Sequence, residues 1–243
     1  MNIFQFDSEQ AWINGVVSLW RDRLRVRPRS RICLTSGHTP LKIYQAMRQA
    51  CAAGQVSFAQ AEVFALDDFG GLAADDPGRC PSMLREYLID GTDLPKERFH
   101  TIDTEALDLE KVCRAYDALI GPGFDLCILG IGLNGHVGLN EPGSPLDSVT
   151  RRVELHPSTV EASAKYLEHS NLPRWGVGVG LKQLLGSNEL WLLANGRSKA
   201  EIVRRVVRGE ISEDVPASLA RRHANSFLFL DSEAAGRLVH ASD

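Results

Sequence analysis

The chain has 243 residues, of which 44% are hydrophobic and 24% charged, and this favours one large α/β domain over two small ones. A net charge of −4 and a pI of about 6.0 exclude nucleic-acid binding through a general basic surface, so an anionic ligand must be met by local cations. The cysteines show no CxxC spacing, which argues against a zinc site or a redox pair. We expect no secretory signal and no membrane span, and therefore a reduced, cytoplasmic compartment.

The first part of the chain alternates predicted helices with buried strands. Asp7 or Ser8 can cap a first helix that runs to about Leu24. A short strand at 31–34 leads into the small polar loop TSGHTP, and a second helix begins near Pro40. A strand, a polar loop and a helix start present backbone N–H groups and a positive dipole end to an anion. From this segment alone, an anion site and a plain connector are equally good interpretations.

A second apolar strand, 62–66, ends in two adjacent carboxylates, Asp67 and Asp68. By themselves, two such residues are more often solvated turn residues or helix caps than catalytic groups. They matter for function only if the end of this strand adjoins another reactive loop. Amphipathic helices are predicted at 83–88 and 109–120.

The most informative stretch is 124–146, with the sequence FDLCILGIGLNGHVGLNEPGSPL. It starts as a nearly continuous apolar run, which is typical of a strand buried on both faces of a parallel sheet. A glycine-rich loop with His136 follows, and an NEPG turn then brings Glu141. Open α/β sheets bind ligands at such loops, beyond the carboxyl ends of their strands. The pattern predicts that His136 and Glu141 meet there as an acid/base pair.

The rest of the chain continues this alternation, with strands at 152–155, 174–180, 189–194 and 226–230 and helices at 157–166 and 200–207. The glycine-rich strand lacks the GxGxxG spacing of a dinucleotide site. Weak apolar periodicity predicts a mobile lid within 156–173. No linker or repeat divides the chain, so we predict one domain over 1–243. Its fold class is α/β, with a single doubly wound, mostly parallel sheet flanked by helices.

Five motifs in order resemble those of the glucosamine-6-phosphate deaminase/isomerase family: TSGHTP, LDDF, GIGLNGHVGLNEPG, LPRWGVGVG and NGRSKA. They extend from Arg31 to about Val207, and the histidine-containing motif is the most specific. The resemblance implies a modified Rossmann-like fold and the conversion of an amino-sugar 6-phosphate to a ketose 6-phosphate and ammonia. It implies no cofactor and no metal ion. The implied partner is a small phosphorylated amino sugar, with neither nucleic acid nor membrane.

The resemblance assigns four residues to the chemistry. His136 matches the histidine that opens the sugar ring, a step suited to a group that titrates near neutrality. Glu141 and Asn134 match the positions that orient and tune this histidine, although many relatives have Asp where this chain has Asn134. An amide orients an imidazole without stabilising its protonated form as a carboxylate would. Asp67 matches the base that moves a proton between C2 and C1, and Asp68 is expected to shape the loop or hold Asp67.

The resemblance also assigns the substrate phosphate to six residues: Ser36, Gly37, His38, Thr39, Arg174 and Lys199. Loop N–H groups, hydroxyls, a guanidinium and an ammonium together suit a dianion. Lys199 lies in a predicted first helical turn, where the helix dipole disfavours a cation, and a bound anion would compensate for this. His38 departs from the small residue, usually Gly, of most relatives.

Several alternatives stay open. The 6-phosphogluconolactonases share the fold and the phosphate loop, but their GxDGHxAS segment lacks the NEPG sequence, and lactone hydrolysis needs no C2 base. A phosphosugar-sensing module would have no reason to keep Asp67, His136 and Glu141 together. Within the deaminases, residues 76–80 look like galactosamine-6-phosphate enzymes, whereas 53–58 and LPRWGVGVG look like glucosamine-6-phosphate enzymes, which we favour. The short C-terminal region predicts a monomer or a small homo-oligomer.

Overall fold

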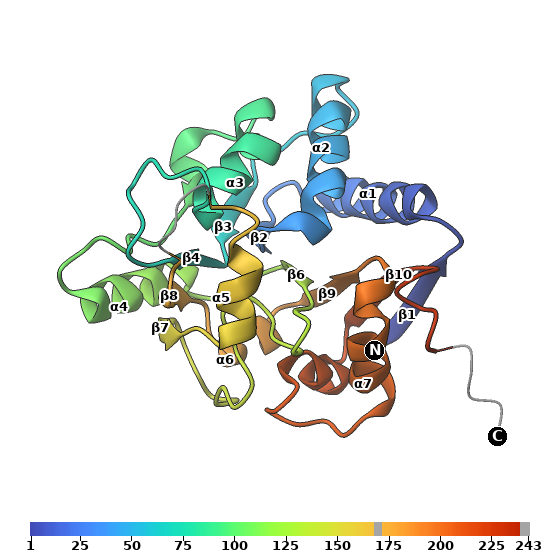
Figure 1. The fold of residues 1–243 in the computed structure, drawn as a ribbon. Coiled ribbons are helices and arrows are strands. Elements are labelled where there is room, and N and C mark those ends of the chain that lie inside the picture. Colours follow the sequence, from blue (N-terminus) through green and yellow to red (C-terminus); the bar gives the residue numbers. More distant parts are fainter. Residues whose placement is uncertain (168–171, 239–243) are drawn as a thin grey trace.

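A large parallel sheet forms the centre of the molecule. The computed structural model describes residues 1–167 and 172–238 (Figure 1). Within these residues the sheet has seven strands, in the order β1 (Asn2–Phe6), β10 (Ser226–Asp231), β9 (Glu189–Ala194), β6 (Leu126–Gly130), β2 (Arg31–Leu34), β3 (Glu62–Ala65) and β5 (Phe99–His100). Every neighbouring pair runs parallel. The predicted α/β class with a parallel sheet is confirmed.

Helices cover both faces of this sheet, as Figure 1 shows. One face packs against α1 (Glu9–Val26), α2 (His38–Ala52) and α3 (Cys80–Tyr87). The other packs against α4 (Leu109–Ile120), α6 (Leu181–Leu185) and α7 (Ala200–Arg208). Consecutive residues of β6 alternate between these two cores, with Ile128 in the first and Cys127 in the second. This two-sided burial is why the strand sequence is continuously apolar.

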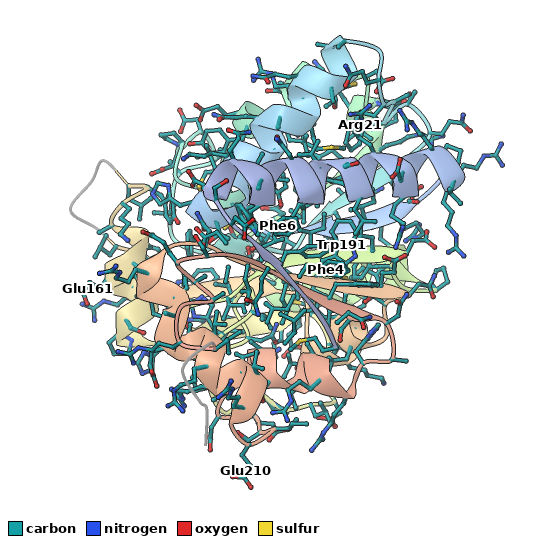
Figure 2. The ribbon with its side chains drawn as sticks, turned by 90° about the vertical axis from the view of Figure 1, so that its right-hand side faces the viewer. Phe4, Phe6, Arg21, Glu161, Trp191 and Glu210 are labelled. Carbon is teal, nitrogen blue, oxygen red and sulfur yellow. The ribbon has the colours of Figure 1, made fainter. Side chains whose placement is uncertain are left out.

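Within the described residues, short 3₁₀ helices occur in four connections: η1 (Ile89–Gly91), η2 (Lys96–Arg98), η3 (Arg197–Lys199) and η4 (Pro216–Arg222). The first α-helix has the predicted cap, because the Ser8 hydroxyl accepts the Ala11 N–H at 3.2 Å. Strand β1, which the sequence analysis did not predict, pairs with β10 at the edge of the sheet. Its Phe6 ring packs against α1 at Gly15, where a Cβ atom would be 2.3 Å from the ring (Figure 2).

A second, smaller sheet corrects part of the predicted topology. It contains β4 (Asp67–Phe69), β8 (Trp175–Gly178) and β7 (Arg151–Glu154), and both of its pairings are antiparallel. The strands predicted at 152–155 and 174–180 therefore exist but do not join the main sheet. The sequences of these two segments indicate an extended conformation but do not specify which strand each one pairs with, because strand pairing is set by tertiary packing. Asp67, which follows β3 closely in the sequence, is the first residue of β4 and so belongs to this small sheet.

The predicted lid within 156–173 falls on a helix and on residues beyond it. The helix is α5 (Pro157–Ser163), followed by a turn that includes Tyr166, while 168–171 lie outside the described residues. Both the lid and the single-domain boundary remain predictions.

All five cysteines lie within the described residues and are free thiols. None of the described helices is long and apolar enough to cross a membrane.

Candidate active site

A cleft of about 320 Å³ opens where several strands of the main sheet end. Its walls come from the loops after β2 and β6, the start of β4, the residues after β9, and α5 with its following turn. Seven predicted site residues line it: Ser36, Gly37, His38, Thr39, Asp67, His136 and Lys199. Parallel strands bring their carboxyl ends to one edge of a sheet, which is why segments far apart in the sequence meet here.

His136 lies in the cleft and contacts Glu141, which is almost fully buried behind it. Nδ1 of His136 is 3.4 Å from Oε2 of Glu141 and 3.2 Å from Oγ1 of Thr159. Asn134 links the two, because its side-chain N–H donates to Oε2 of Glu141 at 2.8 Å and its Oδ1 accepts the His136 backbone N–H at 3.1 Å. The backbone N–H of His156 donates to the other Glu141 oxygen at 3.2 Å. These contacts fix both the imidazole and the carboxylate.

The electrostatics of this pair keep Glu141 ionised. Burial by itself raises the pKa of Glu141, but the hydrogen bond and charge of His136 outweigh it, with further hydrogen bonds from Thr159 and Asn134. The pKa of Glu141 is consequently lowered to about 2. A carboxylate that stays charged orients the imidazole and stabilises its protonated form. Glu141 can therefore support proton transfer by His136.

Asp67 lies in the same cleft in a very different environment. Asp67 is only 4% exposed. This burial, reinforced by the negative charge of Asp68, raises the pKa of Asp67 to about 7. Hydrogen bonds from Cys80 and from the Leu139 N–H act in the opposite direction but only partly offset the burial. A carboxyl group that titrates near neutrality suits a general base at physiological pH.

Asp68, next to Asp67 on β4, points away from the cleft and is fully buried. Its Oδ2 accepts from Nε and Nη2 of Arg79 at 2.8 and 2.5 Å, and its Oδ1 accepts the backbone N–H groups of Phe69 and Cys80 at 2.9 and 3.1 Å. Nη2 of Arg79 also donates to Thr104 at 3.1 Å. This cluster connects β4 to the start of α3, and sequence reasoning found neither the ion pair nor the role of Arg79.

The loop after β2 forms the opposite end of the cleft and exposes the start of α2. Gly37 precedes the helix with φ of +97°, and no side chain of the described residues caps it. The backbone N–H of His38 donates to the hydroxyl of Tyr166 at 3.1 Å, and the two rings lie 4.8 Å apart. A helix start without a side-chain cap presents a positive dipole end, which favours a bound anion.

Two lysines face this end of the cleft. Lys199 donates from Nζ to the Ile131 carbonyl at 2.5 Å, and burial together with the charge of Lys165 lowers its pKa to about 8. Lys165, in the turn after α5, also lines the cleft, although the sequence analysis assigned it no role. A buried lysine beside a second cation is stabilised by a bound anion. The pair is therefore suited to a phosphate.

Arg174 has a different location from the other predicted site residues. It is exposed just before β8, and its carbonyl accepts the Leu155 N–H at 2.8 Å. It is not among the described residues that line the cleft. The geometry thus gives no support to the predicted phosphate contact of Arg174, and Lys165 offers a cation in its place. Across the described residues, no group of three His, Cys, Asp or Glu side chains is arranged to hold a metal ion.

Similarity to known proteins identifies the family of this chain. The family model described as glucosamine-6-phosphate isomerases/6-phosphogluconolactonase matches residues 7–229. The chain belongs to this family. Within it, a glucosamine-6-phosphate deaminase of Bacillus pumilus (strain SAFR-032) is 34% identical over 237 residues, which cover 96% of this chain and 98% of that protein. A glucosamine-6-phosphate deaminase of Rhodopirellula baltica is 38% identical, with 89% and 88% covered.

Solved structures of the glucosamine-6-phosphate isomerase/6-phosphogluconolactonase family separate the two branches. A monomeric glucosamine-6-phosphate deaminase is 31% identical, with a TM-score of 0.94 and coverage of 98% of this chain and 100% of that one. A 6-phosphogluconolactonase of Thermotoga maritima is 20% identical, with a TM-score of 0.75 and coverage of 95% and 99%. The second similarity shows the shared fold alone. At the level of identity that indicates function, the chain groups with the deaminase enzymes of the family.

Proposed function

We propose that the chain converts glucosamine 6-phosphate and water to fructose 6-phosphate and ammonia. The observation that carries this proposal is the pairing of two proton-transfer groups in one cleft: Asp67, with a pKa of about 7, and His136, held by Glu141. Isomerisation of an amino sugar needs both groups, because opening the ring and moving the C2 proton are separate steps. The identity to glucosamine-6-phosphate deaminases over nearly the full chain supports the same reaction.

In the proposed mechanism, the phosphate binds at the start of α2, between the backbone N–H groups and hydroxyls of residues 36–39 and the cations of Lys199 and Lys165. His136 then carries a proton from the C1 hydroxyl to the ring oxygen, and the ring C–O bond breaks. Glu141 stabilises the imidazolium formed in between, while Asn134 keeps the two aligned. An amide at Asn134 suffices because Glu141 supplies the negative charge.

The carbon chemistry falls to Asp67. Its carboxylate removes the C2 proton while the aldehyde oxygen at C1 takes up a proton from water, which forms an enolamine. The Asp67 carboxyl then gives its proton to C1, which leaves a protonated imine at C2. Water adds to C2 of the imine, the C–N bond breaks, and the amino nitrogen leaves as ammonia. The low exposure of Asp67 strengthens the carboxylate as a base, since burial disfavours its charged form.

The discriminating experiment is an ammonia-release assay with glucosamine 6-phosphate and galactosamine 6-phosphate side by side, together with a lactonase assay on 6-phosphogluconolactone. We expect ammonia from glucosamine 6-phosphate, less from the galactosamine epimer and no lactone hydrolysis. Preferred release from galactosamine 6-phosphate would move the assignment to that epimer. Lactone hydrolysis without ammonia release would identify the protein as a lactonase. Binding of these sugar phosphates without any turnover would identify it as a sensor.

We further propose that the protein works as a monomer in the cytoplasm. The deaminase structure that covers 98% of this chain is a monomeric enzyme. Light scattering at assay concentrations tests the oligomeric state, and a stable higher oligomer would contradict it.

A further inference from the structure

We propose that Thr159, in the first turn of α5, is a positioning residue for His136: its hydroxyl accepts the Nδ1–H of the imidazole, which leaves Nε2 as the ring nitrogen that exchanges protons with the substrate. This role rests on the proposed function only in taking His136 as the proton carrier for ring opening. The sequence motifs assign Thr159 no role, because it lies outside the loop that carries His136 and Glu141.

The first turn of α5 is anchored to Glu141, and this places Thr159 beside the imidazole. The backbone N–H of His156, the N-cap residue of α5, donates to Oε1 of Glu141 at 3.2 Å. The Thr159 N–H donates to the His156 carbonyl at 2.8 Å. Thr159 is 7% exposed and lines the cleft, and its Oγ1 lies 3.2 Å from Nδ1 of His136. One turn of helix therefore contacts both members of the histidine–glutamate pair.

The ring of His136 is also held by its own loop, because it packs closely on Gly132. A Cβ atom at Gly132 would lie 2.3 Å from Cε1 and 2.4 Å from each nitrogen of the ring, so the ring lies directly against the glycine backbone. Within the described residues, the hydrogen bond and the ion pair of this ring both involve Nδ1. The His136 side chain is 20% exposed and lines the cleft, so Nε2 is the nitrogen left for the substrate.

The charge of Glu141 decides which atom of the contact between Thr159 and His136 carries the proton. Glu141 stays ionised, with a pKa lowered to about 2, and its Oε2 lies 3.4 Å from Nδ1. An ionised carboxylate can only accept hydrogen bonds, so a proton on Nδ1 is favoured, whereas a lone pair there would face a negative charge. The Thr159 hydroxyl then accepts from Nδ1–H, and this tautomer has its lone pair on Nε2.

Glu141 by itself holds the Nδ1 proton weakly. Its Oε2 already accepts from the Asn134 side chain at 2.8 Å, and 3.4 Å exceeds the usual N–H···O distance of about 2.7–3.2 Å. Thr159 is the closer of the two acceptors, at 3.2 Å. The hydroxyl of Thr159 is therefore the contact that fixes the direction of the Nδ1–H bond.

The test compares the wild-type protein with Thr159→Val and Thr159→Ala, which remove the hydroxyl, and with Thr159→Ser, which keeps it. ¹⁵N NMR of the neutral histidine rings reports which nitrogen carries the proton and needs no substrate, and His136→Gln identifies the His136 signals. We expect the Nδ1–H tautomer to dominate in the wild type and in Thr159→Ser. The share of the Nε2–H tautomer should increase when the hydroxyl is removed.

Steady-state kinetics give a second readout that a merely structural role would not move. Loss of the hydroxyl should reduce kcat/KM for cyclic glucosamine 6-phosphate by roughly 2- to 10-fold, the effect of one neutral hydrogen bond, and leave kcat/KM for an open-chain analogue nearly unchanged.

Thr150→Val is the matched control. Thr150 is 3% exposed, its hydroxyl donates to Oε1 of Gln183 at 3.4 Å, and it is not among the described residues that line the cleft. This variant also removes a buried, hydrogen-bonded hydroxyl, but it should change neither the tautomer of His136 nor the ratio of kcat/KM for the two substrates.

The two proposals fail separately. If the wild-type protein releases no ammonia from either amino-sugar phosphate, the proposed function is wrong, while the ¹⁵N spectra still decide how Thr159 holds His136. If turnover occurs but the tautomer of His136 is the same with and without the hydroxyl, the role of Thr159 is overturned and the proposed function stands. An equal loss of kcat/KM for the cyclic and open-chain substrates would also overturn it, because the hydroxyl would then act on a step other than ring opening.

Discussion

Gly138, in the loop after β6, lies directly against the carboxylate of Asp67 at the start of β4. A Cβ atom at Gly138 would be 2.9 Å from Oδ2 of Asp67 and 2.6 Å from the Leu66 side chain. Gly138 also has φ of +57°, a backbone conformation that favours glycine. The loop that carries His136 and the strand that carries the proposed base therefore touch at a point with no room for a side chain. This contact places the loop of His136 against the strand of the proposed base.

Gly138→Ala should displace the Asp67 carboxylate and reduce kcat by about tenfold or more, since small misplacements of a base are costly. It should also destabilise the fold by roughly 1–3 kcal/mol, because of its positive φ. Gly54→Ala is the matched control: Gly54 has φ of +67°, and no heavy atom of the described residues lies within 4 Å of its Cβ position. Steady-state kinetics and chemical denaturation measure both effects. An equal loss of kcat in the two variants would mean that the contact with Asp67 does not matter.

Asp67→Asn should remove nearly all turnover while the protein stays folded. It should also be more stable than the wild type above pH about 7. Burial raises the pKa of Asp67 from 3.8 to about 7 in the folded state, so the stability tied to its protonated form is fully present below about 3.8 and lost as the pH rises through about 7. Asparagine does not ionise, so the variant avoids this loss. Above pH about 7 its free energy of unfolding should exceed that of the wild type by roughly 1–4 kcal/mol. Denaturation midpoints at low and high pH measure it, and turnover near the wild-type level would contradict the assigned base.

The sequence predicts the frame of the site better than its contacts. The alternating strands and helices and the loop around His136 follow from local patterns, because a doubly buried strand is continuously apolar. Adjacent carboxylates, by contrast, resemble a turn. In the structure Asp67 and Asp68 lie on a strand, whose alternation sends one to the cleft and the other to Arg79. That partner lies 11 residues away, and no local pattern marks it.

The placement of phosphate-binding cations shows the same limit. Lys199 follows a buried strand at the carboxyl edge of the sheet, so its position in the cleft is predictable from the chain alone. Lys165 reaches the cleft only because α5 and the turn after it pack along the cleft, which is a tertiary relationship. Arg174 fits the motif but immediately precedes β8 of the small sheet, whose pairing the sequence does not specify.

The activity should depend on pH as a bell-shaped curve. Asp67 must be deprotonated to act as a base, so kcat/KM should rise with pH to about 7. Lys199 must be protonated to bind phosphate, so kcat/KM should fall above about 8. Lys199→Arg keeps the cation and should extend the alkaline limb to higher pH, because arginine does not deprotonate in this range. An unchanged alkaline limb in this variant would assign the fall to another group.

His136→Gln should slow ring opening and therefore depress turnover of the cyclic substrate far more than turnover of an open-chain analogue. Glu141→Gln should show the same pattern in milder form, because it removes the charge that stabilises the imidazolium but leaves His136 in place. The ratio of kcat/KM for the two substrates measures this. If neither variant recovers on the open-chain analogue, His136 acts in the carbon chemistry as well.

Lys165→Ala and Arg174→Ala separate the two candidates for the second phosphate-binding cation. Lys165 lines the cleft beside Lys199, whereas Arg174 is exposed outside the described lining. A phosphate contact is present both before and during the reaction, so its loss raises KM and leaves kcat nearly unchanged. We expect Lys165→Ala to raise KM by roughly 10- to 100-fold and Arg174→Ala by much less, since a charge-assisted hydrogen bond contributes about 1.5–3 kcal/mol. Binding of inorganic phosphate, measured by calorimetry, should weaken in the same order. The reverse order would return the phosphate to Arg174, as the sequence motifs predicted, and would require that residue to enter the cleft when substrate binds.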